Sequence, residues 1–207
     1  MLGFPSTTEV IRVIPKAAFY ENLKLKPQEK RLFVSQIDRI TLVNSIKPST
    51  MKIKEGERCN EILVLRIDLK KKEIDGSLLE AIAKQNHRPL VFVCQYLNES
   101  CVHVYRQRLY GTEWAPTESF SLITVAKTND DLWDSICSQI ALGSNIGVTA
   151  EDLDARLQLK WQSNVLETEV SRLTDRSRKE KQLAKKNKLF EEAQTKQQEL
   201  NRLKAVE

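Results

Sequence analysis

Apolar residues recur at every second position, or in short continuous runs, in several segments of the first 125 residues. Such patterns are typical of β-strands, because successive side chains of a strand point to opposite faces of the sheet. Residues 98–100, Asn-Glu-Ser, predict a tight turn that joins two of these segments into a hairpin. The predicted strands are Ile40 to Ile46, Met51 to Lys54, Glu61 to Leu69, Leu90 to Tyr96, Cys101 to Leu109 and Ser119 to Val125.

Other segments carry apolar residues three or four positions apart, which is the spacing of one face of an α-helix. Pro15 and Pro27 suit the first turn of a helix, and Thr7, Asp75 and Asn129 are residue types that favour helix starts. The predicted helices run from Thr7 or Thr8 to Val13, from Lys16 to Leu23, from Pro27 to Ile40, from Leu78 to Gln85 and from Leu132 to Leu142.

The order of these elements is helices, then strands with one helix among them, then a last helix. That order is typical of an α+β fold in which helices flank a mixed or antiparallel sheet. We predict one globular α+β domain over residues 1–146, which is long enough to bury a hydrophobic core. A long helical, coiled-coil extension follows over residues 147–207.

The extension is the most unusual part of the chain, because no glycine or proline occurs between Val148 and Glu207. Its many Glu, Lys, Gln and Leu residues favour helix and predict one continuous helix from Glu151 to Ala205. At about 1.5 Å per residue that helix would be roughly 80 Å long, too long to pack wholly on a domain of this size. We therefore expect the extension to meet a second copy of the chain or a partner protein.

An apolar stripe runs along the predicted helix in two parts. Leu159, Leu166 and Leu173 recur every seven residues, as in a coiled coil, and Val170 adds an intermediate position. The stripe lapses over residues 175–188, which is compatible with a stutter, a bent hairpin or a solvated spacer. The first part either forms a coiled coil, within or between chains, or packs on the domain. The second part, in a shifted register, consists of Leu189, Ala193, Leu200 and Leu203.

The net charge of the 207 residues is +5 and is spread over both regions. Residues 151–207 hold 13 basic and 11 acidic side chains, so the excess there is small. It permits contact with DNA, but it is equally typical of an ordinary solvated surface. The candidates for nucleic-acid binding are Lys30, Arg31, Lys70, Lys71, Lys72, Arg176, Arg178, Lys185 and Lys186.

The four cysteines show no Cys-x-x-Cys spacing and the chain has only two histidines, so we expect no structural zinc site and no cofactor. Cys94 and Cys101 are interpreted as small buried hydrophobic residues of a reduced, cytoplasmic protein. The N-terminus lacks the apolar core of a signal peptide, and no apolar run is long enough to span a bilayer. We therefore expect no contact with a membrane.

Sequence motifs of nucleotide-binding loops, dinucleotide folds, serine hydrolases and zinc proteases are absent. One pattern resembles a restriction-nuclease-like site, since Asp68 and Lys70 share a face near the end of a predicted strand. There the carboxylate would hold Mg²⁺, the lysine would stabilise charge on a phosphate, and Glu61 is a candidate for the second acid. The alternative is a solvent-facing pair of charges at a strand edge. The lack of a distinctive general base favours a protein without catalytic activity.

A set of short motifs along the domain is distinctive in combination. It comprises Ile14-Pro-Lys16, Phe19-Tyr20, Lys30-Arg-Leu-Phe33, Gln36-Ile37, Ile46-Lys-Pro48, Glu113-Trp114, Leu132-Trp133 and Gln139-Ile140. Together these motifs resemble an uncharacterised bacterial family that is catalogued only as a domain of unknown function. The resemblance covers residues 1–142. It implies a genomic setting beside DNA helicases and DNA methyltransferases of restriction or phage-defence clusters, and it implies no catalytic residues.

Three hypotheses follow from the residues and the resemblance. The first is a non-catalytic accessory subunit of a DNA-processing or antiviral defence complex. It would dock through its C-terminal helix onto itself or onto a partner such as a DNA helicase or methyltransferase. The second is a Mg²⁺-dependent nuclease that uses Asp68 and Lys70. The third is a direct nucleic-acid binder.

Overall fold

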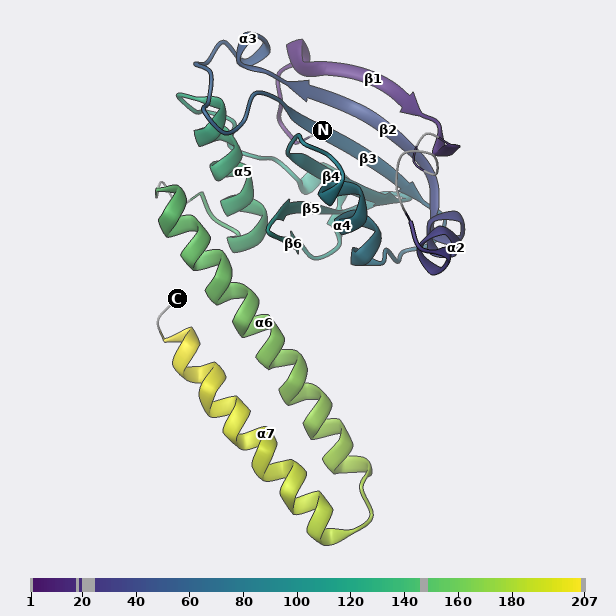
Figure 1. Ribbon diagram of the computed structural model, residues 1–207, viewed down its shortest axis with the longest axis vertical. Helices are drawn as coiled ribbons and strands as arrows, with labels where there is room; N and C mark the ends of the chain where they lie inside the picture. Colours follow the sequence, from purple (N-terminus) through teal and green to yellow (C-terminus); the bar gives the residue numbers. More distant parts are fainter. Residues whose placement is uncertain (1, 18, 20–24, 146–148, 206–207) are drawn as a thin grey trace. The chain divides into compact units, whose positions relative to one another are not determined.

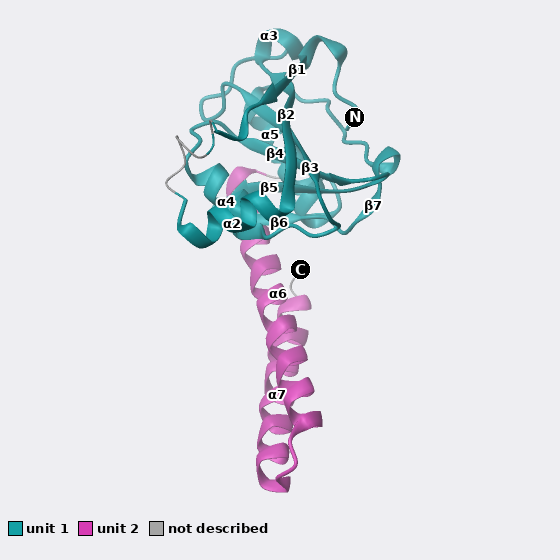
Figure 2. Cartoon of the chain, turned by 90° about the vertical axis from the view of Figure 1, so that its right-hand side faces the viewer, with its two compact units in different colours: residues 1–147 teal, residues 148–207 magenta. Residues whose placement is uncertain are grey.

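The structure of the protein is a computed structural model that describes residues 2–17, 19, 25–145 and 149–205 (Figure 1). Contacts within the chain divide it into two compact units, residues 1–147 and residues 148–207 (Figure 2). The first unit is called the body below, and the second is called the arm.

The body is built on a seven-stranded mixed sheet, so its fold is α+β. The strands follow the order β1-β2-β3-β4-β5-β6, and β7 pairs with β5. All neighbouring strands are antiparallel except β3 and β4, which are parallel. The strands are β1 (Glu9–Ile14), β2 (Ile37–Ile46), β3 (Ile62–Leu69), β4 (Leu90–Tyr96), β5 (Glu99–Arg106), β6 (Arg108–Gly111) and β7 (Ala115–Pro116).

The parallel pair exists because a helix connects its two strands, as a parallel connection requires. This helix, α4, spans Gly76–Lys84 between β3 and β4. Asp75 caps it, since the Asp75 carboxylate accepts a hydrogen bond of 2.9 Å from the backbone N–H of Ser77. β4 lies inside the sheet, and its first five residues are therefore all buried.

Helices lie on both faces of the sheet (Figure 1). Tyr105 of β5 lies beneath the ammonium group of Lys84 in α4, whereas the next residue, Arg106, pairs with Asp134 of helix α5 (Asn129–Leu142). Adjacent residues of a strand point to opposite faces, so α4 and α5 cover different faces. Helix α2 (Pro27–Gln36) contacts α4 and shares its face. The main core between these two helices and the sheet includes Phe33, Ile37, Ile67, Leu78, Leu79 and Phe92, all fully buried.

Both ends of α5 follow from local sequence. Thr128 and Asp131 form a capping box, in which each side chain accepts a hydrogen bond from the backbone N–H of the other residue. The helix ends at Gly143, whose φ of 72° lies in the left-handed region that favours glycine.

The predicted N-terminal helix is wrong, and its residues form a short 3₁₀ turn, Ser6–Thr8, followed by strand β1. Val10, Ile11, Val13 and Ile14 are β-branched and favour a strand once β2 offers a pairing edge. The helix predicted from Lys16 to Leu23 falls largely outside the described residues.

Three other boundaries differ from the sequence prediction. Helix α2 ends at Gln36 and β2 begins at Ile37, so Ile37 and Ile40 belong to a strand. The strand predicted at 51–54 is wrong, because Pro48–Met51 form the short helix α3 and only Lys54 makes an isolated bridge. The strand predicted at 119–125 is also wrong, since residues 117–119 form a 3₁₀ turn and only Ser121 pairs, with Leu2.

The arm is a helical hairpin of two antiparallel helices, α6 (Ala150–Lys179) and α7 (Leu183–Lys204), so the predicted continuous helix is wrong (Figure 1). Glu180 and Gln182 both have extended backbone, with ψ of 129° and 115°, and this reverses the chain without glycine or proline. The shifted register of the apolar stripe explains the bend. Repeats of seven from Leu173 reach residues 180 and 187, whereas the second stripe lies at residues 189, 193, 200 and 203. One straight helix would place the two parts on different sides, while a hairpin turns them towards each other.

The two helices of the arm bury their stripes against one another. Leu166 and Leu173 of α6 and Ala193 and Leu200 of α7 are each at most 8% exposed. Spacings of three and four residues alternate along each seam, as when side chains of two helices interlock. The seam therefore needs no second molecule. Half-buried positions extend it on both helices, and they are Leu159, Val170, Leu189, Lys196 and Leu203.

Candidate functional site

The structure engages Asp68 and Lys70 in separate local contacts. The Asp68 carboxylate lies between two guanidinium groups, 3.2 Å from Arg39 and 3.1 Å from Arg66. The Lys70 ammonium donates a hydrogen bond of 2.8 Å to the backbone carbonyl of Val34 in the last turn of α2. A lysine there complements the partial negative charge at a helix C-terminus. Both predicted nuclease residues thus have structural partners.

Glu61 precedes β3, whereas Asp68 lies near the other end of this strand. At about 3.3 Å per residue the two positions are roughly 23 Å apart, so the structure does not bring them to one metal ion. Glu61 instead contacts Arg88 at 2.6 Å and Lys47 at 3.5 Å, and it accepts a hydrogen bond from Ser45. Partial burial opposes its charge, but these three partners outweigh burial and lower the pKa of Glu61.

The basic candidates of the body do not form one free patch. Lys71 pairs with Glu73 at 2.6 Å, and Lys72 pairs with Glu99 at 2.7 Å while lying over the ring of Trp114. Lys30 and Arg31 are exposed on α2. Lys71 and Lys72 therefore already have acidic partners, whereas Lys30 and Arg31 lie exposed on a different element.

The bend of the arm collects the other basic candidates at one end. We define the tip as residues 175–188, which form the last turn of α6, the reversal at 180–182 and the first turns of α7. The tip holds seven basic and two acidic side chains, a net charge of +5, whereas the other arm residues from 151 on hold six basic and nine acidic ones. The basic side chains of the tip are all exposed: Arg176, Arg178, Lys179, Lys181, Lys185, Lys186 and Lys188.

A favourable interaction with a helix dipole accounts for only three of the seven basic side chains of the tip. Arg176, Arg178 and Lys179 lie in the last turn of α6, where positive charge is favourable. Lys185 and Lys186 lie in the first turns of α7, where the helix dipole disfavours positive charge and the first turn holds no acidic residue. The lysines on the α7 side therefore weaken the helix that carries them, and their charge suits an external anion.

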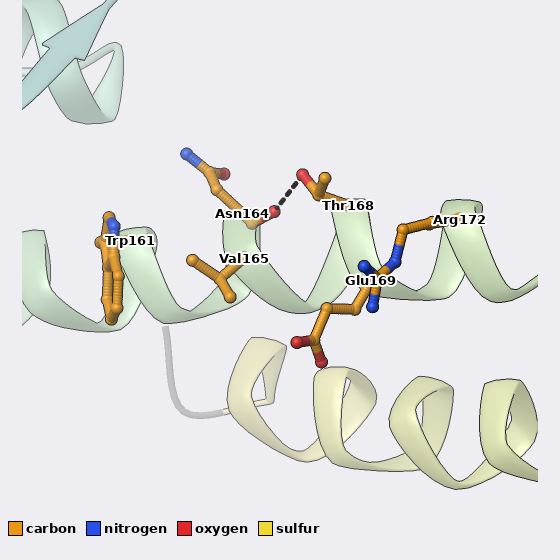
Figure 3. A pocket seen from close by; sticks show the side chains of 6 residues that line it. All are labelled: Trp161, Asn164, Val165, Thr168, Glu169 and Arg172. Carbon is orange, nitrogen blue, oxygen red and sulfur yellow. Dashed lines mark hydrogen bonds between the residues drawn. The ribbon is translucent and has the colours of Figure 1, made fainter. Parts of the chain in front are cut away.

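An open groove follows one side of α6 (Figure 3). Within it the hydroxyl of Thr168 donates a hydrogen bond of 2.9 Å to the backbone carbonyl of Asn164. The lining side chains combine an aromatic ring, an aliphatic group and polar or charged groups of both signs. They are Trp161, Asn164, Val165, Thr168, Glu169 and Arg172.

Two cysteines and one histidine meet on the face of the sheet that carries α2 and α4. Cys94 of β4 lies directly opposite Cys101 of β5, and His103 follows Cys101 on the same side of that strand. One ligand atom from each of the three residues lies within 4.8 Å of the other two. Both cysteines are buried and reduced, and His103 is half-buried. Two sulfurs and one imidazole nitrogen are a donor set for a soft metal ion.

The pKa values of the two thiols are shifted in opposite directions. A hydrogen bond from Cys94, and another from His103, lower the pKa of Cys101, while the same contact with Cys101 and burial raise the pKa of Cys94. One sulfur of the pair is thus the better anion and metal ligand, because only a thiolate binds a metal strongly.

Sequence reasoning missed this cluster because it searched for ligands a few residues apart on one segment. The available signal was the hairpin itself, but its turn lies at residues 97 and 98 rather than at the predicted residues 98–100, which shifts the register. A tight turn after Tyr96 pairs Tyr96 with Glu99 and, two steps further along, Cys94 with Cys101. His103 then follows on the same face from alternation alone.

Comparison with known proteins finds one family match. Residues 2–200 match a family described as "Domain of unknown function (DUF4391)". No curated protein and no solved structure matches the chain. No helix in the described part of the chain combines the length and apolar character that crossing a membrane requires.

Proposed function

Because the chain belongs to the family described as "Domain of unknown function (DUF4391)", a description that assigns no activity, we propose a function from its own surface. The protein is a non-catalytic accessory subunit of a DNA-processing complex, and its arm brings the complex into contact with DNA. The genomic setting implied by the resemblance, beside DNA helicases and methyltransferases of bacterial defence clusters, supports the class of complex and of protein partner.

The segregation of charge along the arm carries this proposal. The tip has a net charge of +5, equal to that of the whole chain, while the rest of the arm is slightly acidic. Basic side chains that contact phosphates release condensed counterions, and this gain supplies most of the affinity in contacts without sequence preference. A +5 cluster on two antiparallel helices can contact several successive phosphates, whereas the acidic sides of the arm repel them.

Exposed apolar residues lie within and just beyond the basic tip on α7. Leu183 is 72% exposed and Phe190 is 53% exposed, and the two are seven residues apart on one side of the helix. Phe190 also lies one turn beyond Lys186, so an aromatic ring and a basic side chain share a face. Aromatic rings next to basic residues stack on unpaired bases, which suits DNA with single-stranded character.

The self-association that we expected from the apolar stripe loses its main support. The seam residues that would have formed an intermolecular coiled coil are covered within the hairpin. A protein partner would therefore bind the outer surface of the arm or the body, and we assign no second copy of the chain to the seam.

Fluorescence anisotropy with labelled single-stranded and duplex DNA tests the proposal. The tip variant Lys185→Glu/Lys186→Glu and a control variant outside the tip, called the shaft variant, Arg172→Glu/Arg202→Glu, change the net charge by the same amount. The two tip substitutions lie on α7, and the shaft variant has one substitution on each helix. We expect the wild type to bind with steep salt dependence, and the tip variant to bind about tenfold or more weakly with a salt slope smaller by roughly 2. The shaft variant should bind like the wild type.

The choice of variant separates binding from folding. The helix dipole favours glutamate in the first turns of α7, so the helices of the tip variant should be at least as stable as those of the wild type. Absence of DNA binding by the wild type, affinity that does not change with salt, or equal losses in the two variants would contradict the proposal.

A further inference from the structure

We propose that Cys94, Cys101 and His103 form a binding site for one soft metal ion, with zinc as the physiological occupant. The proposal concerns the body alone and is independent of DNA binding by the arm. It differs from our expectation that the cysteines serve only as small hydrophobic residues.

The hairpin geometry supplies three ligands without any change of backbone. Cys94 and Cys101 are partners across β4 and β5, and His103 is two residues from Cys101 on the same face. In a tetrahedral zinc site the metal lies about 2.3 Å from sulfur and 2.0–2.1 Å from nitrogen, so neighbouring ligand atoms are about 3.5–3.8 Å apart. The observed separations, within 4.8 Å, need only small side-chain rotations to reach that geometry.

The absence of a side chain at Gly111 leaves room for the imidazole of His103. Gly111 of β6 lies opposite His103, and a Cβ atom at Gly111 would be 2.3 Å from the His103 Cδ2 atom and 2.6 Å from its Nε2 atom. A side chain at position 111 would therefore displace the ring. The glycine keeps the imidazole on the sheet face beside the thiols.

His103 also carries an unsatisfied polar atom. Its Nδ1 atom is buried and has no hydrogen-bond partner among the described residues. Buried nitrogen atoms are almost always satisfied by protein, water or an ion, because leaving one unpaired costs free energy. A metal ion bound by this nitrogen would satisfy it, whereas a purely hydrophobic role for the cluster leaves it unpaired.

The site has three protein ligands, so one position of a tetrahedron stays available for water or an external ligand. Binding replaces thiol protons with the metal, and those protons are released to solvent. The other two described cysteines, Cys59 and Cys137, lie outside the cluster and serve as controls.

Titration of the reduced, metal-free full-length protein with Co²⁺ tests the site, because cobalt occupies zinc sites and reports thiolate ligation by a charge-transfer absorption band. We expect one equivalent to bind, the band to appear, added Zn²⁺ to displace the cobalt, and the melting temperature to rise with Zn²⁺. The proposal would be overturned if the reduced protein bound neither metal. This includes the case in which the protein is isolated with a Cys94–Cys101 disulfide and still binds no metal after reduction.

Four variants locate the ion. Cys101→Ser, His103→Ala and Gly111→Ala should each weaken binding by about tenfold or more, since loss of even supporting groups costs 10–100-fold in metal affinity. The double control Cys59→Ser/Cys137→Ser should bind like the wild type. If Cys101→Ser does not fold, His103→Ala decides the matter, because His103 is only half-buried. Unchanged affinity in His103→Ala, or an equal loss in the control, would show that the ion binds elsewhere.

Discussion

Asp130 attaches the loop before β3 to the start of α5 through a single carboxylate. It accepts hydrogen bonds from the backbone N–H groups of Glu57, Arg58 and Cys59 at 2.8–3.2 Å, and the Arg58 guanidinium lies 3.5 Å away. The loop passes so close that a Cβ atom at Gly56 would be 2.2 Å from the Asp130 carboxylate. A charged acceptor with several donors contributes more than a neutral hydrogen bond.

We therefore predict that Asp130→Asn lowers the free energy of unfolding by about 1.5–3 kcal/mol, because the amide is a weaker acceptor and brings its own donors. Gly56→Ala should also destabilise the body, since its methyl group would displace the carboxylate. Chemical denaturation of the two variants checks this, with Glu118→Gln, an exposed acid elsewhere on the body, as the control. Stability equal to that of the control would disprove the role of Asp130.

Glu61 makes the stability of the body depend on pH. Burial alone would raise its pKa, but Ser45, Lys47 and Arg88 together lower the pKa of Glu61 from the ordinary value of 4.5. A group whose pKa is lower in the folded state stabilises the protein above its unfolded pKa, and this contribution is lost as pH falls through the folded value. Glu61→Gln should thus melt below the wild type at neutral pH, and the two melting temperatures should converge below pH 4.5. A constant difference across this range would refute the assignment.

The hairpin of α6 and α7 depends on few large side chains, because serines and a lysine occupy other seam positions. Leu200 is 3% exposed in the seam, whereas Phe190 is 53% exposed on the same helix. We predict that Leu200→Ala lowers the stability of the arm by about 2–4 kcal/mol, while Phe190→Ala costs much less.

Hydrogen exchange of the full-length protein distinguishes these outcomes element by element. Leu200→Ala should speed exchange of the amides in α6 and α7 and leave those of β3 and β4 protected, because the sheet has its own core. Phe190→Ala should leave the exchange of both helices near that of the wild type. Equal acceleration in the two variants would show that the seam does not hold the hairpin.

The division of the chain into two units predicts that the body folds without the arm. Its sheet and helices form a hydrophobic core from residues of the body, and the seam of the arm is formed by α6 and α7. Residues 1–147 alone should therefore keep the circular dichroism of an α+β protein and unfold cooperatively, but should lose affinity for DNA. A fragment that is unfolded, or one that still binds DNA like the full chain, would contradict this division of roles.

Much of the fold follows from local pattern. The alternation in residues 61–69 and the apolar run in residues 90–94 predicted β3 and β4 within one or two residues, and Asp75 marked the start of α4. Asn129, expected to start the last helix, is the first residue of α5, but the residue that caps this helix is Thr128. These elements have strong internal signals, since burial imposes a period of two on strands and of three to four on helices. The α+β class followed from their order.

Contacts between distant segments decided the rest. Residues 9–14 form a strand because β2 offers them hydrogen bonds, and the local sequence does not reveal that β2 will be their partner. The chain reverses at residues 180–182 without glycine or proline, and this reversal lets two stripes of different register bury each other. The thiols and the imidazole gather because strand register brings residues of two strands to one point. Local propensity is a property of a few neighbouring residues, whereas a hairpin, a charged tip and a ligand cluster exist only once the chain has folded back on itself.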